Sequence, residues 1–204
     1  GVPVSRFGMQ KAPIAHQYFI FRKDSKSGLG HYDPFNKRIN RVEKTRTYGI
    51  DPRNAEQTFA LDALARPEVQ LVALTGKAGT GKSSLLRLLC QSLPPGLFKP
   101  YYICHSSVGI VEFYTHLVTA FGLESCYRRA AMFRDFKHHV LSMNTTSHIH
   151  PELLIDESHL LNNDILAEIR LLTNYQIDSL NALSVILCGA ESLNRKFGLS
   201  MLEA

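Results

Sequence analysis

The residues best suited to chemistry form a run of eight, Gly76-Lys77-Ala78-Gly79-Thr80-Gly81-Lys82-Ser83. The run fits the pattern G-x-x-x-x-G-K-[ST], in which glycines let the backbone turn tightly around phosphate oxygens. Lys82 is placed to reach the β- and γ-phosphates, and the Ser83 hydroxyl is placed to bind Mg²⁺. The predicted nucleotide-binding residues are Gly76, Lys77, Ala78, Gly79, Thr80, Gly81, Lys82, Ser83 and Ser84. We therefore expect an ATP site, with Lys82 also serving catalysis.

A second candidate element is the pair Asp156-Glu157, which follows the apolar segment Leu153-Leu154-Ile155. Charged groups are costly to desolvate, so two acidic residues at the end of a buried strand indicate a functional role for their carboxylates. Asp156 is placed to hold Mg²⁺ and its water shell, and Glu157 is placed to polarise the water that attacks the γ-phosphate. Asp-Glu pairs also occur at ordinary helix starts. The spacing after Lys82 favours the catalytic interpretation.

Two further side chains are weaker candidates. Gln57 lies 19 residues before Gly76, and a glutamine amide can pair with adenine N6 and N7 at once. The alternative is an ordinary exposed helix residue. His159 follows the acidic pair closely enough to sense the nucleotide, although most histidines in this chain are expected to be surface or core residues.

The elements expected to position these residues alternate between strands and helices. Strands are predicted over residues 71–75, 101–104, 152–156 and 183–188, and helices over 83–93, 109–121, 128–143, 163–173 and 190–197. The glycine run follows a strand and opens a helix, as phosphate binding requires. Strands that alternate with helices of this length predict an α/β fold. We expect the three-layer sandwich of P-loop NTPases, with a mostly parallel sheet, preceded by a small β-rich N-terminal appendage.

The first quarter of the chain differs from the rest in its charge and in its predicted secondary structure. Residues 1–50 hold 10 Lys+Arg and 3 Asp+Glu, whereas the whole chain has a net charge of +5. An extended lead-in is predicted over 1–15, strands over 16–22, 29–32 and 39–43, and a turn over 25–28. A helix is expected after Asp51 as its N-cap, with Pro52 at its first position. The predicted domains are a basic β-rich segment over 1–47 and an ATPase core over 48–204. Basic and aromatic residues within 16–46 suit RNA or DNA contact, with a solvated basic surface as the alternative.

Length and composition exclude several classes of protein. The chain has 204 residues, of which 45% are hydrophobic and 20% charged, so it is neither disordered nor fibrous. Its apolar runs are far shorter than the roughly 20 residues of a membrane-spanning helix. Four scattered cysteines indicate neither a zinc site nor a disulfide framework. They are expected to be small core residues, which favours a reducing cytoplasm.

Residues from about 16 to 82 resemble the PhoH-like ATPases. The resemblance rests on HQYFIFRKDSKSG, HYDPFNKRINRVEK, YGIDPRNAEQTFALDAL and VQLVALTGKAGTGK. It implies a RecA-like ATPase core linked to RNA unwinding or processing, and it supports Gln57 as an adenine contact. Residues from about 83 to 204 instead resemble AAA ATPases of the ExeA type, through SSLLRLLCQSL, PELLIDESHLL, ILAEIRLLTNYQIDS and SVILCGAESL. This second family includes secretion-pathway components and transposon helper ATPases.

Together the two resemblances imply a hybrid joined at the phosphate loop, Gly79–Ser83. The second one implies a transposase or secretion-system protein as partner, and assembly into a homo-oligomer. Ala190 stands where that family usually has a polar γ-phosphate sensor. A further strand, an interface arginine and a helical lid are not expected within these 204 residues. Three functions stay open: a Mg²⁺-dependent ATPase, a nucleotide-dependent interaction module with little turnover, and an RNA-binding, helicase-like protein.

Overall fold

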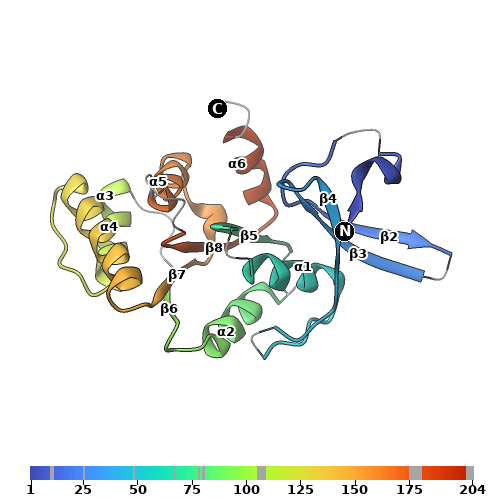
Figure 1. Ribbon diagram of the computed structural model, residues 1–204. Coiled ribbons are helices and arrows are strands. Elements are labelled where there is room, and N and C mark those ends of the chain that lie inside the picture. Colours follow the sequence, from blue (N-terminus) through green and yellow to red (C-terminus); the bar gives the residue numbers. More distant parts are fainter. Residues whose placement is uncertain are drawn as a thin grey trace. The chain divides into compact units, whose positions relative to one another are not determined.

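The computed structural model describes residues 1–9, 12–24, 26–47, 49–66, 68–77, 79, 81–104, 109–174 and 181–200. Its elements alternate as expected beyond residue 70 (Figure 1). The chain divides into two compact units, Gly1–Arg66 and Pro67–Ala204. This division places residues 48–66 with the N-terminal sheet, whereas the sequence put a domain boundary after residue 47.

The Gly1–Arg66 unit contains an antiparallel four-stranded sheet in the order β1-β4-β3-β2. Its strands are β1 (Val2–Pro3), β2 (Tyr18–Lys23), β3 (Lys26–Asp33) and β4 (Arg38–Val42), with the short 3-10 helix η1 (Val4–Phe7) after β1. On one face, the ring of Phe21 stacks on that of Phe7, with 4.8 Å between centroids. A Cβ at Gly30 would lie 2.8 Å from the Phe21 ring, so this face needs glycine there.

Helix α1 (Ala55–Leu64) completes the core of this unit. The ring of Tyr18 stacks on Phe59, with 4.8 Å between centroids, and its hydroxyl donates to Asp62 at 2.7 Å. Burial and the hydrogen bond to Asp62 raise the pKa of Tyr18, so the phenol stays neutral. These contacts explain why α1 belongs to the N-terminal unit.

The predicted start of this helix was wrong. Asn54, not Asp51, is the N-cap, and its side chain accepts a hydrogen bond from the Gln57 amide at 2.8 Å. Asp51 instead lies 3.8 Å from the Arg46 guanidinium. Both residue types cap helices well, so the backbone conformation of the preceding loop decided between them.

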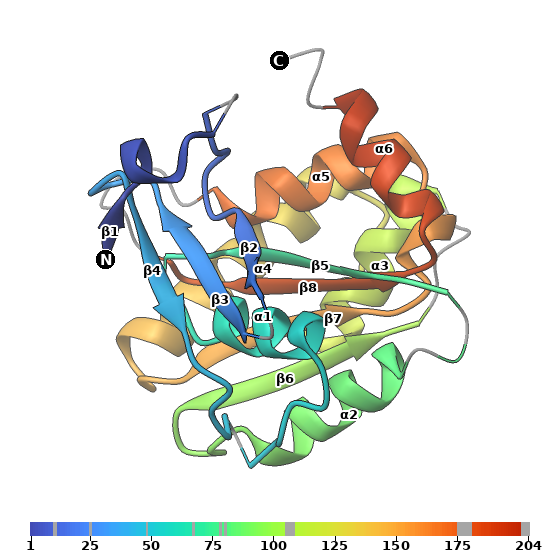
Figure 2. The ribbon, with the colours of Figure 1, turned by 90° about the vertical axis from the view of Figure 1, so that its right-hand side faces the viewer.

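The Pro67–Ala204 unit is built on a parallel sheet in the order β5-β8-β7-β6 (Figure 2). The strands are β5 (Leu71–Thr75), β6 (Phe98–Ile103), β7 (His150–Ile155) and β8 (Ser184–Gly189). The helices are α2 (Lys82–Ser92), α3 (Ile110–Ala120), α4 (Arg129–Thr145), α5 (Asn163–Thr173) and α6 (Ser192–Ser200), and the 3-10 turn η2 (Ser158–Leu160) follows β7. The α/β prediction is therefore confirmed, and the predicted elements agree with these to within a few residues at their ends.

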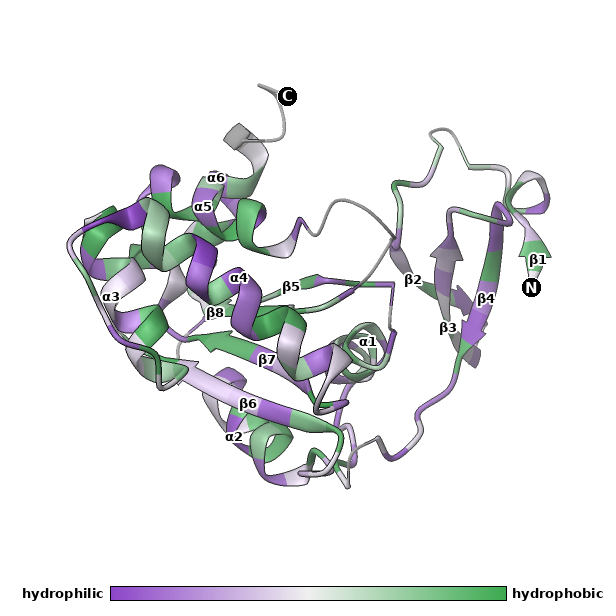
Figure 3. Cartoon of the chain, turned by 60° about the vertical axis from the view of Figure 1, so that its left-hand side comes forward, coloured by the Kyte–Doolittle hydropathy of each residue, from purple (hydrophilic) through white to green (hydrophobic). Residues whose placement is uncertain are grey.

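Both faces of the central strands β7 and β8 are buried, as a sheet covered on two sides requires. Leu153, Ile155 and Leu187 belong to a core cluster with residues of α3, α4 and α5. The alternate residues Leu154 and Ile186 are equally buried on the opposite face. Figure 3 shows α4 in front of this sheet and β7 coloured hydrophobic along much of its length.

Some local expectations failed. The predicted 25–28 turn is shorter, because β3 already begins at Lys26, and the predicted lead-in 1–15 contains β1 and η1. Of the four cysteines, Cys188 is buried, but Cys104 and Cys126 are exposed, so the core interpretation fails for these two. In the described part of the chain, every helix is too short or too polar to cross a membrane.

Candidate nucleotide-binding site

The glycine run lies between the carboxyl end of β5 and the start of α2. Gly79 and Gly81 have φ values of +79° and +83°, which side-chain-bearing residues rarely adopt. A Cβ on either would meet open space, so backbone conformation rather than crowding requires glycine there. Helix α2 begins directly at Lys82, and its first N–H groups have no acceptor within the helix. This turn therefore offers the amide donors and helix dipole that bind anions.

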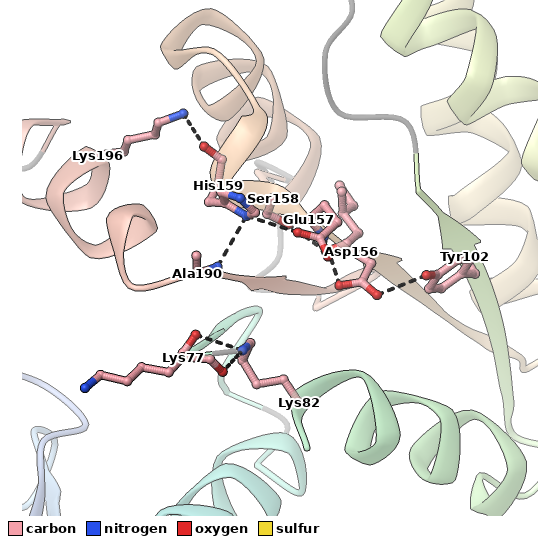
Figure 4. Close-up of polar contacts among 11 residues, drawn as sticks. Lys77, Lys82, Tyr102, Asp156, Glu157, Ser158, His159, Ala190 and Lys196 are labelled. Atoms are coloured by element: carbon pink, nitrogen blue, oxygen red, sulfur yellow. Dashed lines mark hydrogen bonds and ion pairs between the residues drawn. The ribbon is translucent and has the colours of Figure 1, made fainter. Parts of the chain in front are cut away.

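The ammonium group of Lys82 is held over this loop. Its Nζ donates to the carbonyl oxygens of Gly76 and Lys77, at 2.8 and 2.7 Å. Figure 4 shows the Lys82 side chain on the loop side of the site, facing the segment that carries Asp156 and Glu157. These carbonyls orient a positive charge at the place where the sequence predicts phosphates.

The acidic pair follows β7, and its two members differ in environment. Asp156 is only 8% exposed, and its carboxylate accepts from the Glu157 amide at 2.9 Å and from the Tyr102 hydroxyl at 3.1 Å. The Glu157 side chain is 53% exposed, and its backbone has a φ of +52°. Such a left-handed backbone in a non-glycine residue costs about 1–3 kcal/mol and often occurs at functional sites. One carboxylate is therefore fixed and the other is accessible.

The loop and the acidic pair line one cavity of about 500 Å³. The loop side is formed by Gly76, Gly79, Gly81, Lys82, Ser83 and Ser84, and the opposite side by Asp156, Glu157, His159, Gly189 and Ala190. These residues come from the ends of β5, β7 and β8, which are neighbours in the sheet. Ligands of open parallel sheets bind at this edge, beyond the carboxyl ends of the strands.

Two neighbours of Asp156 have shifted protonation equilibria. Burial, together with the Asp156 charge, raises the pKa of the Cys188 thiol to about 12. Burial, together with hydrogen bonds to Cys104 and Asp156, raises the pKa of Tyr102. Both groups therefore keep their protons near neutral pH and remain donors beside the Asp156 carboxylate.

The structure brings together most, but not all, of the predicted site residues. Ala78 and Thr80 lie outside the described residues. Gln57 belongs to the other unit, where its side-chain oxygen accepts from the Arg53 amide at 2.8 Å, so its adenine contact stays a prediction. Basic residues of the 16–46 segment are likewise in the Gly1–Arg66 unit, and contact with nucleic acid stays a prediction.

Sequence reasoning overlooked Tyr102 and underestimated His159. Tyr102 lies near the end of β6, which pairs with β7, and this adjacency brings its hydroxyl to Asp156. His159 Nδ1 lies 3.3 Å from a carboxylate oxygen of Glu157. The alternation of strands and helices could have signalled Tyr102, since neighbouring parallel strands end at one edge. The histidine contact depends on the turn after β7, which the sequence alone did not show.

Comparison with known proteins decides the family. Residues 67–197 match the sequence profile of the AAA domain family. The chain belongs to this family of P-loop ATPase domains. The matched range contains both the glycine run and the acidic pair of the AAA domain, and the Gly1–Arg66 unit precedes it.

Individual relatives agree with the two resemblances seen in the sequence. The chain is 34% identical over 108 residues to Protein PhoH2 of Bacillus subtilis, covering 50% of this chain and 24% of that protein. It is 31% identical over 128 residues to General secretion pathway protein A of Aeromonas hydrophila, covering 61% of this chain and 23% of that protein. The chain thus spans about a quarter of the length of these relatives. The solved structure of Cdc6p from Pyrobaculum aerophilum aligns over 63% of this chain and 36% of its own, with a TM-score of 0.48 at 18% identity, too distant to inform function.

Proposed function

We propose that this AAA domain binds Mg²⁺–ATP and hydrolyses it, and that the hydrolysis drives action on a nucleic acid or protein partner. The proposal rests on the cavity that is lined by the phosphate loop on one side and by Asp156 and Glu157 on the other. A loop of this type binds phosphates, and an accessible carboxylate facing it can act as a general base. Membership of the AAA family supports the same chemistry.

The loop residues would bind the triphosphate. Backbone amides of the turn around Gly79 and Gly81 would donate to its oxygens, together with the start of α2. Lys82 would leave the carbonyls of Gly76 and Lys77, both within 2.8 Å of its Nζ, for the β- and γ-phosphates. Exchange of neutral carbonyl partners for anionic ones favours binding, because hydrogen bonds between charged groups are stronger.

The donor set also fits a magnesium ion. A hydroxyl and a carboxylate, Ser83 and Asp156, line the same cavity, and Mg²⁺ prefers oxygen ligands of this kind. The bound ion would neutralise charge that develops on the phosphate oxygens. Glu157, being half exposed, would take the proton of the attacking water. Tyr102 would keep the Asp156 carboxylate oriented.

Substitution of Lys82 tests the proposal. The variant Lys82→Ala should lower the affinity for ATP on the order of 100-fold, because a charged partner of the phosphates is removed. Arg87→Ala is the matched control, since Arg87 is an exposed cation of α2 outside the residues that line the cavity. Its affinity should stay within about threefold of the wild type by isothermal titration calorimetry. Equal ATP affinity in the wild type and Lys82→Ala would overturn the proposal.

A second function, contact with RNA or DNA, is favoured by a particular feature of the Gly1–Arg66 unit. Lys23 and Lys26 are exposed and lie directly opposite each other in the β2–β3 pair. Like charges placed opposite each other repel, and Asp24 of the connecting turn balances one of the two charges. A phosphate backbone at this hairpin end would relieve the repulsion.

We propose a secretion-system protein or a transposase as the protein partner. The name of the Aeromonas relative, General secretion pathway protein A, points to a secretion component, and the ExeA-type resemblance also points to a transposase. An interaction module with little turnover is the alternative, and steady-state hydrolysis would exclude it. We also propose a reducing cytoplasm, because Cys104 and Cys126 are exposed free thiols.

A further inference from the structure

One ring nitrogen of His159 lies between two residues that follow the neighbouring strands β7 and β8. His159 Nδ1 lies 3.3 Å from Glu157 Oε2, at the end of β7, and 3.3 Å from the backbone nitrogen of Ala190, just after β8. Figure 4 shows the His159 ring between these two groups. All three residues line the candidate nucleotide cavity.

The two contacts require opposite roles of this nitrogen. The Ala190 amide can only donate, so Nδ1 must offer its lone pair to it. The Glu157 carboxylate can only accept, so Nδ1 must carry a proton to bond to it. A single nitrogen cannot satisfy both partners at once. Both separations are slightly longer than an optimal hydrogen bond, as expected for a nitrogen placed between competing partners.

The rest of His159 is fixed in place. Its carbonyl oxygen accepts from Lys196 Nζ of α6 at 2.6 Å. Its backbone also packs closely against β8, because a Cβ at Gly189 would lie 2.9 Å from the His159 nitrogen. Before it, Ser158 is fully buried and its hydroxyl donates to the Ile155 carbonyl at 2.6 Å. The side-chain bond is therefore the part of His159 that can alternate.

We propose that His159 is a positioning residue that couples Glu157 to the junction between β8 and α6. In one state, Nδ1–H donates to the Glu157 carboxylate and holds it beside the cavity. When Glu157 turns toward the water that it activates, Nδ1 is released and accepts the Ala190 N–H. The ring is neutral in both states, with its proton on Nδ1 in the first and on Nε2 in the second. The side chain is 23% exposed, so water can carry this exchange.

This coupling rests on the proposed ATPase function and extends it. Ala190 has no polar side chain that could contact the nucleotide. Through this coupling, its backbone amide would respond to the nucleotide instead. Ala190 lies two residues before Ser192, the first residue of α6, so that response would reach the start of this helix. The state of the catalytic carboxylate would thereby be transmitted to the first turn of α6.

The test uses the full chain with His159→Ala and His159→Asn, and His138→Ala, an exposed histidine of α4, as matched control. An asparagine places one amide near the position of Nδ1, and this amide offers either a donor or an acceptor. Three quantities are measured: the affinity for ATP by calorimetry, kcat, and hydrogen exchange of the Ala190 amide with and without a nonhydrolysable ATP analogue and Mg²⁺.

We expect the analogue to slow exchange of the Ala190 amide in the wild type and in His138→Ala. In His159→Ala this response should vanish and kcat should fall about tenfold, within the range of catalytic positioning effects, while ATP affinity changes less than twofold. His159→Asn should restore at least half of the lost kcat. A kcat within twofold of the wild type in His159→Ala, or an unchanged Ala190 response, would overturn the coupling alone. Absence of ATP binding to the wild type would overturn the proposed ATPase function, and the coupling with it.

Discussion

The two sheets of this protein differ in how their polar and charged groups are distributed. The parallel sheet β5-β8-β7-β6 places chemical groups at one edge, where the ends of neighbouring strands meet. The antiparallel sheet β1-β4-β3-β2 instead spreads charge over its surface: residues 1–66 hold 12 basic and 6 acidic residues, whereas residues 67–204 hold 11 and 12.

This difference follows from strand direction. Parallel strands all end on the same side, so short loops after β5, β7 and β8 converge on one cavity. Antiparallel strands alternate in direction, so their ends are divided between two edges and do not gather in one place. A specific catalytic site is therefore expected in one unit, and a diffuse electrostatic surface in the other. Substitutions in each unit test this contrast.

Replacement of the accessible carboxylate should abolish catalysis in the AAA domain without affecting binding. In Glu157→Gln, kcat for ATP should fall at least about 100-fold, because the amide cannot serve as the proposed general base. The affinity for ATP should stay within about threefold, since Glu157 is not expected to contact the phosphates. Steady-state phosphate release and calorimetry check this. Turnover near the wild-type rate would assign the base to another group.

Burial of an acid in the parallel sheet should make stability depend on pH. Burial raises the pKa of Glu152 from 4.5 to about 7. The folded chain therefore binds a proton that the unfolded chain has lost, so this contribution to stability is complete below pH 4.5 and is lost as pH rises through 7. A shift of this size corresponds to about 3 kcal/mol of unfolding free energy.

Glu152→Gln should remove this dependence, so that the variant gains stability relative to the wild type between pH 5 and pH 8. Urea unfolding followed by circular dichroism measures this, because the chain has no tryptophan. The exposed Glu124→Gln is the control and should follow the wild type. His150, whose pKa is lowered by burial, acts in the opposite direction below pH 6.5, and its Nε2 lies 3.9 Å from Glu152 Oε1. The contribution of Glu152 is therefore measured between pH 6.5 and pH 8.

Removal of charge from the antiparallel sheet should weaken nucleic-acid binding in a salt-dependent manner. The double variant Lys23→Ala/Lys26→Ala should lower affinity for single-stranded RNA about tenfold and reduce the slope of log K against log salt by about 1.4, at about 0.7 per charge. Arg128→Ala/Arg134→Ala removes two exposed charges from the other unit as a control. Fluorescence anisotropy at several salt concentrations checks this. An equal loss in the control would assign binding to the AAA domain instead.

Point substitutions are preferable to deletion of residues 1–46. Such a deletion would remove Tyr18, the stacking and hydrogen-bonding partner of α1, and would expose the apolar face of that helix.

Loss of the cap of α1 should have the smallest effect, confined to the N-terminal unit. Asn54→Ala should cost about 1 kcal/mol, because the Gln57 amide loses its acceptor. Asp51→Ala, the residue first expected to be the cap, should cost less than about 0.5 kcal/mol. Hydrogen exchange of the Gln57 amide distinguishes the two. Equal acceleration in both variants would contradict the assignment of Asn54.

The sequence predicted the second unit better than the first. Short apolar runs that alternate with helical segments indicate buried parallel strands, so β5, β7 and β8 were located to within about two residues. In the N-terminal unit, turns and caps depend on single residues with similar preferences, and there the 25–28 turn and the Asp51 cap were wrong.

The phosphate loop and the acidic pair could be located from the sequence alone, since each residue type there suits its proposed local chemistry: glycines for positive φ, a lysine for phosphate, and carboxylates for Mg²⁺ and water. Only the tertiary structure decided which groups surround them. Tyr102 reaches Asp156 because β6 pairs with β7, and His159 lies between Glu157 and Ala190 because a turn packs against the end of β8. Contacts between residues far apart in the chain depend on the order of the strands in the sheet, and the sequence of one segment does not specify which strand lies beside it.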